Sequence, residues 1–271
     1  MVWESGGVSS TTRLPTRVSG PALVIGAAAV TAFLVLVRVA LTSERGQAAD
    51  EHAMLTVAAG REAELTLLSI LGRVPIWSAA TLAVVCLVLA ARRHHWRAVI
   101  GAAVVIVGAN VTTQMLKPVL DRPDLGYGIH NSLPSGHVTV AASVVAALLL
   151  VVPAGARAAV AGLGTFAVGL TGLSTIVAGW HRPADVVAAL VVALGWCAVA
   201  VVVQGGRRAR ARAVLPTALS GAVAALLAIV LIGVRPVEGM DGFVDASLVL
   251  GAVALVTAVA VSAMAWIAPD A

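Results

Sequence analysis

The chain is divided into long apolar runs that contain almost no charged side chains. Several runs reach the roughly 20 residues that a helix needs to cross a bilayer, and they exceed the roughly 9–11 residues of a barrel strand. The alternation of polar and apolar residues that is typical of barrel strands is missing. Hydrophobic residues make up 60% of the chain and charged residues only 11%, too few for a soluble domain of this length. The sequence therefore predicts an all-α, polytopic membrane protein.

Eight runs qualify as candidate spans, at residues 20–42, 75–91, 98–116, 137–152, 158–180, 184–203, 214–234 and 246–268. The second run is marginal in its apolar character, and the fourth is short. We expect these eight spans to form one helical bundle. The first run is longer than the apolar core of a signal peptide, so we interpret it as a retained helix.

The same pattern predicts how the chain is organised along its length. Residues 1–17, rich in Ser, Thr and Gly, are expected to form a mobile cytoplasmic tail. We expect residues 18–205 to form the main membrane bundle and residues 206–271 to form two additional transmembrane helices. These last two spans could cover the bundle, mediate a homo-oligomer or shape the access of a ligand.

Basic residues occur in alternate loops and indicate the orientation of the chain. They are Arg13, Arg17, Arg92, Arg93, Arg97, Arg157, Arg207, Arg208, Arg210 and Arg212. Eight spans would place all of these loops on one side, which the positive-inside rule assigns to the cytoplasm. Most acidic residues lie in the opposite loops, so we expect a multi-pass protein of the cell membrane with both termini cytoplasmic. The arginine run at 207–212 is then a topology signal beside anionic lipid rather than a nucleic-acid site.

The two cysteines, Cys86 and Cys197, each lie inside an apolar run. Their spacing fits neither a disulfide framework nor a metal site. We expect both to be small buried hydrophobic side chains. No cluster of carboxylates suggests a metal, so the sequence predicts no metal and no cofactor.

Two polar connections interrupt the apolar pattern. The segment KPVLDRPDLGYGIHNSLPSGH joins the third and fourth spans, and GWHRPAD joins the fifth and sixth. Both are predicted on the extracytoplasmic side, and they meet if the third to sixth spans form a bundle. They would bring together Lys117, Arg122, Ser135, His137, His181 and Asp185. The sequence thus predicts a polar site at the outer boundary between water and lipid.

The residue types in this set favour phosphate chemistry. Lysine and arginine attract anions, and the arginine fork matches the geometry of phosphate oxygens. Ser135 and Gly136 stand where the fourth span begins, and the unpaired N–H groups of a helix N-terminus bind phosphate. One imidazole can attack phosphorus, while the other protonates the leaving oxygen and then activates water. Asp185 lies one helical turn after His181 and is placed to orient its imidazole.

Each of these residues also has a plainer interpretation. A single Lys or Arg at a helix end is usually an interfacial anchor, and Ser135 would serve as a helix cap. His181 beside Trp180 would belong to an interfacial aromatic belt, and Asp185 would be a first-turn charge favoured by the helix dipole. Because all of these residues fall in two loops on one side, their coincidence favours a site.

The two segments resemble the signature of the type 2 phosphatidic acid phosphatase superfamily, which reads K-x6-RP, then PSGH, then SR-x5-H-x3-D. The second part is complete, from Pro134 to His137. The third part reads STIVAGWHRPAD and ends at Asp185, and the first reads KPVLDRP and begins at Lys117. The resemblance covers approximately residues 110–190.

The chain departs from the family pattern at two points. Four residues, instead of six, separate Lys117 from Arg122 and Pro123. Thr175 stands where the family has Arg, so a neutral hydroxyl replaces a charge. The loss of a charged hydrogen bond typically costs about 1.5–3 kcal/mol. We therefore expect slow turnover, a preference for a less charged phosphate, or another basic residue in the site, for which Arg182 is the candidate.

The resemblance implies a role for each matched residue. His181 would be the nucleophile, His137 the general acid, and Asp185 the residue that orients His181. The phosphate would be held by Lys117, Arg122, Ser135 and Gly136, and we expect Thr175, at the position of the family arginine, to contact it as well. The resemblance also implies a metal-independent enzyme that is built on a bundle of six core spans.

The first functional hypothesis is a membrane phosphatase that hydrolyses a lipid phosphate monoester or diphosphate outside the cytoplasmic membrane through a phosphohistidine. Candidate substrates are phosphatidate, phosphatidylglycerophosphate, and a polyprenyl phosphate or diphosphate. The alternative is a catalytically weakened phospholipid-binding or scaffold protein, which the two departures motivate. A transporter is disfavoured, because we find no inverted repeat and no pair of broken helices.

Overall fold

The computed structural model describes residues 19–57, 96–206, 211–234 and 242–270, together with the single residues 84, 88 and 240. Within these ranges the regular structure is helical and contains no β-strand. The helices are α1 (Gly20–Ala40), α2 (Glu44–Thr56), α5 (Trp96–Val119), α6 (Gly136–Val151), α7 (Arg157–Val177), α8 (Pro183–Gln204), α9 (Val214–Leu231) and α10 (Phe243–Ile267), with a short 3-10 helix at Ala154–Ala156. The all-α prediction is confirmed for this part of the chain.

Six of these helices are long and apolar enough to cross a membrane: α1, α5, α7, α8, α9 and α10. Helix α6 is equally apolar but has only 16 residues, which matches the short fourth run of the sequence. The run at 75–91 and the tail at 1–17 lie outside the described residues. The chain is therefore a multi-pass membrane protein, while the total of eight spans stays a prediction.

The helix that carries Asp185 has clear start and stop signals. Pro183 is its first residue, where a proline costs no hydrogen bond because the first-turn N–H groups have no partner within the helix. The carboxylate of Asp185 accepts a 2.9 Å hydrogen bond from the backbone N–H of Arg182. The helix ends at Gln204, and Gly205 follows with a φ of 65°, a left-handed value that glycine adopts without strain.

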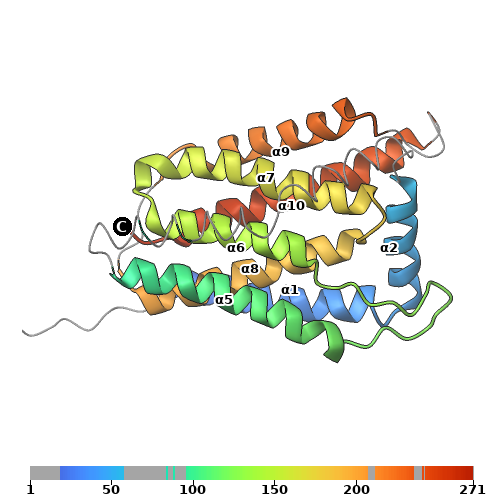
Figure 1. Ribbon diagram of the computed structural model, residues 1–271, viewed down its shortest axis with the longest axis horizontal. Coiled ribbons are helices and arrows are strands. Elements are labelled where there is room, and N and C mark those ends of the chain that lie inside the picture. The colour runs from blue at the N-terminus through green and yellow to red at the C-terminus, as the bar shows by residue number, and fades with distance from the viewer. Residues whose placement is uncertain are drawn as a thin grey trace, which may run out of the picture.

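The membrane helices run roughly along one common axis, and α2 lies across one end of the bundle (Figure 1). Helix α8 packs against α1, α5, α6 and α10, and α7 packs against α6, α9 and α10. Small residues allow close approach: a Cβ on Gly108 would lie 2.3 Å from the ring of Trp196. The Trp196 indole N–H in turn donates to the Thr112 hydroxyl at 2.9 Å.

Helix α2 was missed from the sequence, where residues 44–56 read as part of an acidic loop. The segment lacks a long apolar run, but most of its residues are good helix formers. The Ser43 hydroxyl caps it by accepting from the Gly46 N–H at 3.0 Å. The buried Gln47 amide donates to the carbonyl oxygens of Leu41, at 2.6 Å, and Pro123, at 3.0 Å. These contacts hold α2 against the end of the bundle.

The opposite end of the bundle holds a second structural feature that the sequence did not predict. Arg157, expected only as a topology signal, is fully buried and donates to the carbonyl oxygens of Ala268 and Pro269. It thereby ties α7 to the residues after α10. Cys197 is buried as expected, and Cys86 lies outside the described residues. The boundary at 205 between a main bundle and two additional helices stays a prediction.

Candidate active site

The two polar connections of the sequence are joined by a backbone hydrogen bond. The Ser135 N–H donates to the Asp185 carbonyl oxygen at 3.0 Å. Asn131 brings its loop back to the end of α5, since its amide donates to the carbonyl oxygen of Leu120, the residue after this helix, at 2.8 Å. The expected meeting of the PSGH turn with the start of α8 is therefore present in the structure.

The PSGH turn presents unpaired donors at the start of α6. Ser135 is the N-cap residue, yet its hydroxyl makes no capping bond and is buried without a hydrogen-bond partner. Gly136 opens the helix, so the N–H groups of its first turn have no acceptor within the helix. A buried hydroxyl beside free N–H groups suits an anion, because the helix N-terminus carries partial positive charge.

Two side chains of α5 face this turn. A Cβ built on Gly136 would lie 3.8 Å from the Lys117 Nζ and 3.8 Å from the Gln114 Nε2. Lys117 was predicted, whereas Gln114 was missed. The available signal was its spacing, because a residue three positions before Lys117 lies on the same helix face. The amide adds two neutral N–H donors at the place where an anion would approach Gly136.

His181 and Asp185 form the hydrogen bond that their spacing predicted. The two side chains are buried, and His181 Nδ1 lies 3.1 Å from Asp185 Oδ2. The same oxygen accepts from the Ser132 hydroxyl at 2.6 Å and from the Arg182 N–H at 2.9 Å. A carboxylate on Nδ1 favours the tautomer in which Nε2 carries the free lone pair. Ser132 is a second residue that the sequence did not single out.

His137 lies across from this pair and is exposed. Its ring packs against Trp180, with centroids 5.9 Å apart and a tilt of 35°. The groups whose charges act on its imidazole are His181 and Lys117. We call Lys117, His137 and His181 the histidine cluster. It has the parts of a phosphoryl-transfer site: two imidazoles, one of them oriented by a carboxylate, beside a cation.

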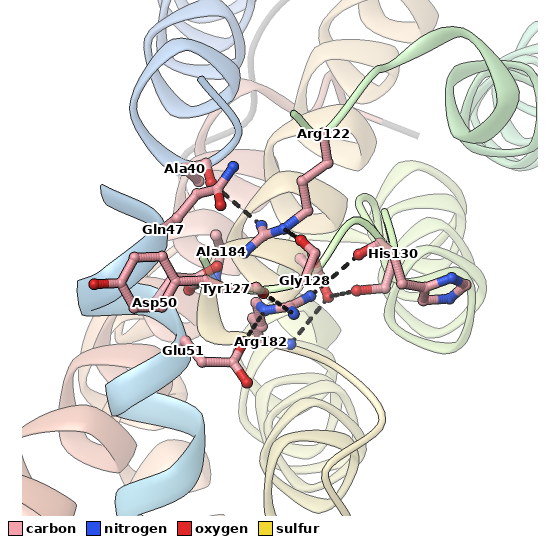
Figure 2. A network of polar contacts seen from close by, with 12 residues as sticks. Ala40, Gln47, Asp50, Glu51, Arg122, Tyr127, Gly128, His130, Arg182 and Ala184 are labelled. Carbon is pink, nitrogen blue, oxygen red and sulfur yellow. Dashed lines mark hydrogen bonds and ion pairs between the residues drawn. The ribbon is translucent and has the colours of Figure 1, made fainter. Parts of the chain in front are cut away.

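The side chains of the two arginines take part in a second network of polar contacts, which includes residues of α2 and of the loop after α5 (Figure 2). We call Asp50, Glu51, Arg122 and Arg182 the arginine cluster. Arg122 is buried; its Nε donates to the Gly128 carbonyl oxygen at 3.0 Å and its Nη1 to that of Ala40 at 3.4 Å. Burial, followed by the neighbouring charge of Arg182, lowers the Arg122 pKa from its usual value. The structure commits two of its nitrogens to carbonyl groups and leaves Nη2 buried without a hydrogen-bond partner, so the expectation that this guanidinium holds phosphate stays a prediction.

Arg182, the candidate for a recruited charge, is paired with α2. Its Nε lies 2.6 Å from Glu51 Oε2, and its terminal nitrogens donate to the carbonyl oxygens of His130 and Tyr127 at 3.4 and 3.5 Å. Figure 2 places it between Glu51 and the loop that carries Tyr127 and His130. All three of its nitrogens thus have acceptors outside the histidine cluster.

Asp50 completes the contact between α2 and α8. Its carboxylate accepts a 2.9 Å hydrogen bond from the backbone N–H of Ala184. Burial raises the Asp50 pKa to about 7; the Ala184 N–H opposes this shift, and the charge of Asp185 adds to it. Helix α2 therefore touches the first turn of α8 directly, beside the residues that bear the imidazole and its carboxylate.

Thr175, which replaces the family arginine, is fully buried. Its hydroxyl donates to the Gly172 carbonyl oxygen of its own helix at 2.8 Å. Its carbonyl oxygen accepts from the backbone N–H groups of Trp180 and His181 at 3.0 and 3.1 Å. In this arrangement Thr175 shapes the turn that carries His181, and its hydroxyl is not free for a ligand.

Comparison with known proteins identifies a family region in the chain. Residues 103–211 match the family model described as the PAP2 superfamily, that is, the type 2 phosphatidic acid phosphatases. No curated protein and no solved structure gave a significant match. The matched region contains the histidine cluster, the PSGH turn and Asp185. The superfamily indicates phosphatase activity on phosphate esters, and the resemblance found in the motifs is confirmed: residues 103–211 form a PAP2 superfamily region within a multi-pass membrane protein.

Proposed function

We propose that this protein is an integral membrane phosphatase that hydrolyses a lipid phosphate monoester or diphosphate on the extracytoplasmic face. The observation that carries the proposal is the hydrogen bond of 3.1 Å between His181 and Asp185, on a turn that is bonded to the PSGH segment. Nucleophile, orienting carboxylate and acid are then present in one place, as covalent catalysis requires.

The proposed reaction has two steps. In the first, the His181 Nε2 lone pair attacks phosphorus; the P–N bond forms and the bond to the leaving oxygen breaks. His137 donates a proton to that oxygen, so the lipid leaves as an alcohol, or as a monophosphate where the substrate is a diphosphate. In the second step His137 takes a proton from water, the water oxygen attacks phosphorus and the P–N bond breaks. Inorganic phosphate is released and both imidazoles return to their starting states.

In the proposal, several groups stabilise the negative charge of the transition state. Lys117 supplies a positive charge, and the first-turn N–H groups of α6 supply oriented dipoles. The Ser135 hydroxyl, buried without a partner, adds a neutral donor. These groups are proposed to hold the phosphoryl oxygens, and the proposal assigns no metal ion to the reaction.

The position of the site supports the proposed lipid substrate and the proposed side of the membrane. The histidine cluster lies at the ends of apolar helices that are long enough to cross a bilayer, so a hydrocarbon tail can stay in lipid while the headgroup reaches the site. The basic loops at the other ends favour the extracytoplasmic side for this site. Phosphatidate, phosphatidylglycerophosphate and polyprenyl phosphates or diphosphates are the proposed substrate set.

The direct test is a search for the covalent intermediate. Purified protein is mixed with lipid that carries labelled phosphate, and the reaction is quenched in base, because phosphohistidine is labile in acid. We expect label on the wild-type protein and none on His181→Ala. His52→Ala, which removes an exposed histidine of α2, serves as the matched control and should retain the label. Equal phosphate release by wild type and His181→Ala would contradict the proposal, and release that resists EDTA would support a metal-independent reaction.

A phospholipid-binding scaffold is the second candidate. The buried Thr175 hydroxyl and the carbonyl-bound Arg122 favour it, since both leave the site with fewer contacts to phosphate than the family pattern provides. Tight binding of the lipid without release of phosphate by the wild-type protein would support the scaffold over the hydrolase.

A further inference from the structure

We propose that α2 holds both arginines apart from the histidine cluster, so that the site selects a lipid monophosphate over the diphosphate of the same lipid. This inference rests on the proposed function, because it names the substrate class of the same site. It depends on how the charges are distributed between the two clusters.

The arginine cluster compensates its own charge. Glu51 pairs with Arg182 at 2.6 Å, and the charges of Asp50 and Glu51 both act on Arg122. The carboxylate of Asp185 acts on Arg122 as well. All three nitrogens of Arg182 have acceptors, and Nε and Nη1 of Arg122 donate to carbonyl oxygens, while Arg122 Nη2 is buried without a partner. Because the carboxylates offset the guanidinium charges, the proposal assigns neither arginine to a second phosphate group.

The histidine cluster, in contrast, carries one permanent cation among the described residues that act on His137, which is Lys117. Gln114 stands beside it at the same 3.8 Å distance from the Gly136 Cβ position, but its amide is neutral. A monophosphate can therefore be matched by one ammonium group, neutral donors and helix N–H groups. A diphosphate brings additional negative charge that this cluster does not compensate, and such charge is costly where water is partly excluded.

The experiment compares two substrates that share one tail, an alkyl monophosphate and the corresponding diphosphate. The purified full-length protein in detergent should show a kcat/KM for the monophosphate roughly tenfold or more above that for the diphosphate. Glu51→Gln keeps the size of the side chain but removes its charge, so Arg182 becomes available. This variant should shift the ratio toward the diphosphate by about threefold or more.

Two further variants keep this result interpretable. Glu44→Gln removes the same charge from an exposed position of α2 and should leave the ratio unchanged. Gln114→Lys adds a cation on α5, independently of α2, and should also shift the ratio toward the diphosphate. The inference is overturned if the wild type prefers the diphosphate or treats both esters alike. It is also overturned if Glu51→Gln and Glu44→Gln change the ratio to the same extent.

A binding measurement separates this inference from the proposed reaction. Non-hydrolysable phosphonate and methylenediphosphonate analogues with the same tail are titrated against the protein. One outcome is that neither ester is hydrolysed, the phosphonate binds more tightly than the diphosphonate, and Glu51→Gln narrows this difference in affinity. In that case the charge selection stands and the hydrolase proposal falls. If the diphosphonate binds as tightly or more tightly, the selection proposal falls whatever the turnover.

Discussion

The Asp50 carboxylate of α2 accepts a 2.9 Å hydrogen bond from the Ala184 N–H in the first turn of α8. A helix outside the membrane spans thus supplies an acceptor to one of the N–H groups that have no partner within α8. The same helix turn carries Asp185, so the stability of this contact bears on the position of the orienting carboxylate.

The burial of Asp50 predicts a pH dependence of stability. Burial raises the Asp50 pKa to about 7 in the folded protein, while an unfolded aspartate titrates near 3.9. Between these values the folded state binds more protons than the unfolded state, so the contribution of Asp50 is present in full below about pH 4 and is lost as the pH rises through 7. Asp50→Asn should remove this dependence.

The measurement is the thermal unfolding midpoint in detergent across this pH range. The midpoint of Asp50→Asn relative to wild type should rise from pH 4 to pH 7 and level off above. Asp121→Asn, at an exposed position of the loop after α5, is the matched control. If the unfolding midpoints of the two variants change with pH in parallel, Asp50 does not titrate as the geometry predicts.

The proton donated by His137 predicts a dependence on the leaving group. His137→Ala should lower the turnover of an alkyl phosphate by about 10²–10⁴-fold, the range that general acid catalysis contributes. An aryl phosphate with an acidic phenol needs little protonation as it leaves, so its first step, formation of the phosphohistidine, should slow less than about tenfold. Single-turnover release of the two alcohols checks the prediction, because the second step needs His137 as a base for either ester. Equal losses in the first step would assign His137 another role.

Asp185 is expected to act through its charge as well as its position. Asp185→Asn replaces an oxygen that accepts from Ser132, His181 and Arg182 and removes the negative charge beside the imidazole. Turnover should fall by about 10²–10⁴-fold, because imidazole orientation and imidazolium stabilisation are both lost. Ser132→Ala removes a single donor and should cost far less. Comparable losses in both variants would indicate that the network only supports the fold.

Gly136 offers a test of where the phosphate lies. A Cβ at this position meets no atom closer than 3.8 Å, so Gly136→Ala should change the free energy of unfolding by less than about 1 kcal/mol. The added methyl group would nevertheless occupy the space between the turn, Lys117 and Gln114. We expect kcat/KM to fall at least tenfold, roughly 1.4 kcal/mol. Unchanged kinetics in this variant would place the phosphate elsewhere.

The packing of α9 against α7 predicts a contrast between two glycines. A Cβ on Gly221 would lie 2.1 Å from the Gly162 carbonyl oxygen, whereas a Cβ on Gly251 meets nothing within 4 Å. Gly221→Ala should therefore destabilise the fold by about 1–3 kcal/mol through overpacking. Gly251→Ala should be neutral or slightly stabilising, because alanine is the better helix former. Unfolding of both variants in detergent, followed by the same probe, would test the difference.

Much of the fold could be predicted because its causes are local. The described membrane helices begin and end within a few residues of the apolar runs, since an apolar run of bilayer length already dictates a helix in lipid. Pro183 marked the start of α8, and the four-residue spacing of His181 and Asp185 fixed their contact, because one helical turn separates them.

The partners of the arginines were decided only by the tertiary structure. Glu51 and Arg182 lie 131 positions apart, and Arg122 meets Ala40 across 82 positions. The family pattern predicts Arg122 at the phosphate, with Arg182 as the substitute candidate, but the acceptors that a guanidinium binds depend on which groups packing brings within reach. These acceptors are distant in the sequence, so composition and motif spacing do not predict them. The sequence by itself therefore determined the membrane helices and the two imidazoles of the site, while packing of α2 on the bundle decided which charges stand beside them.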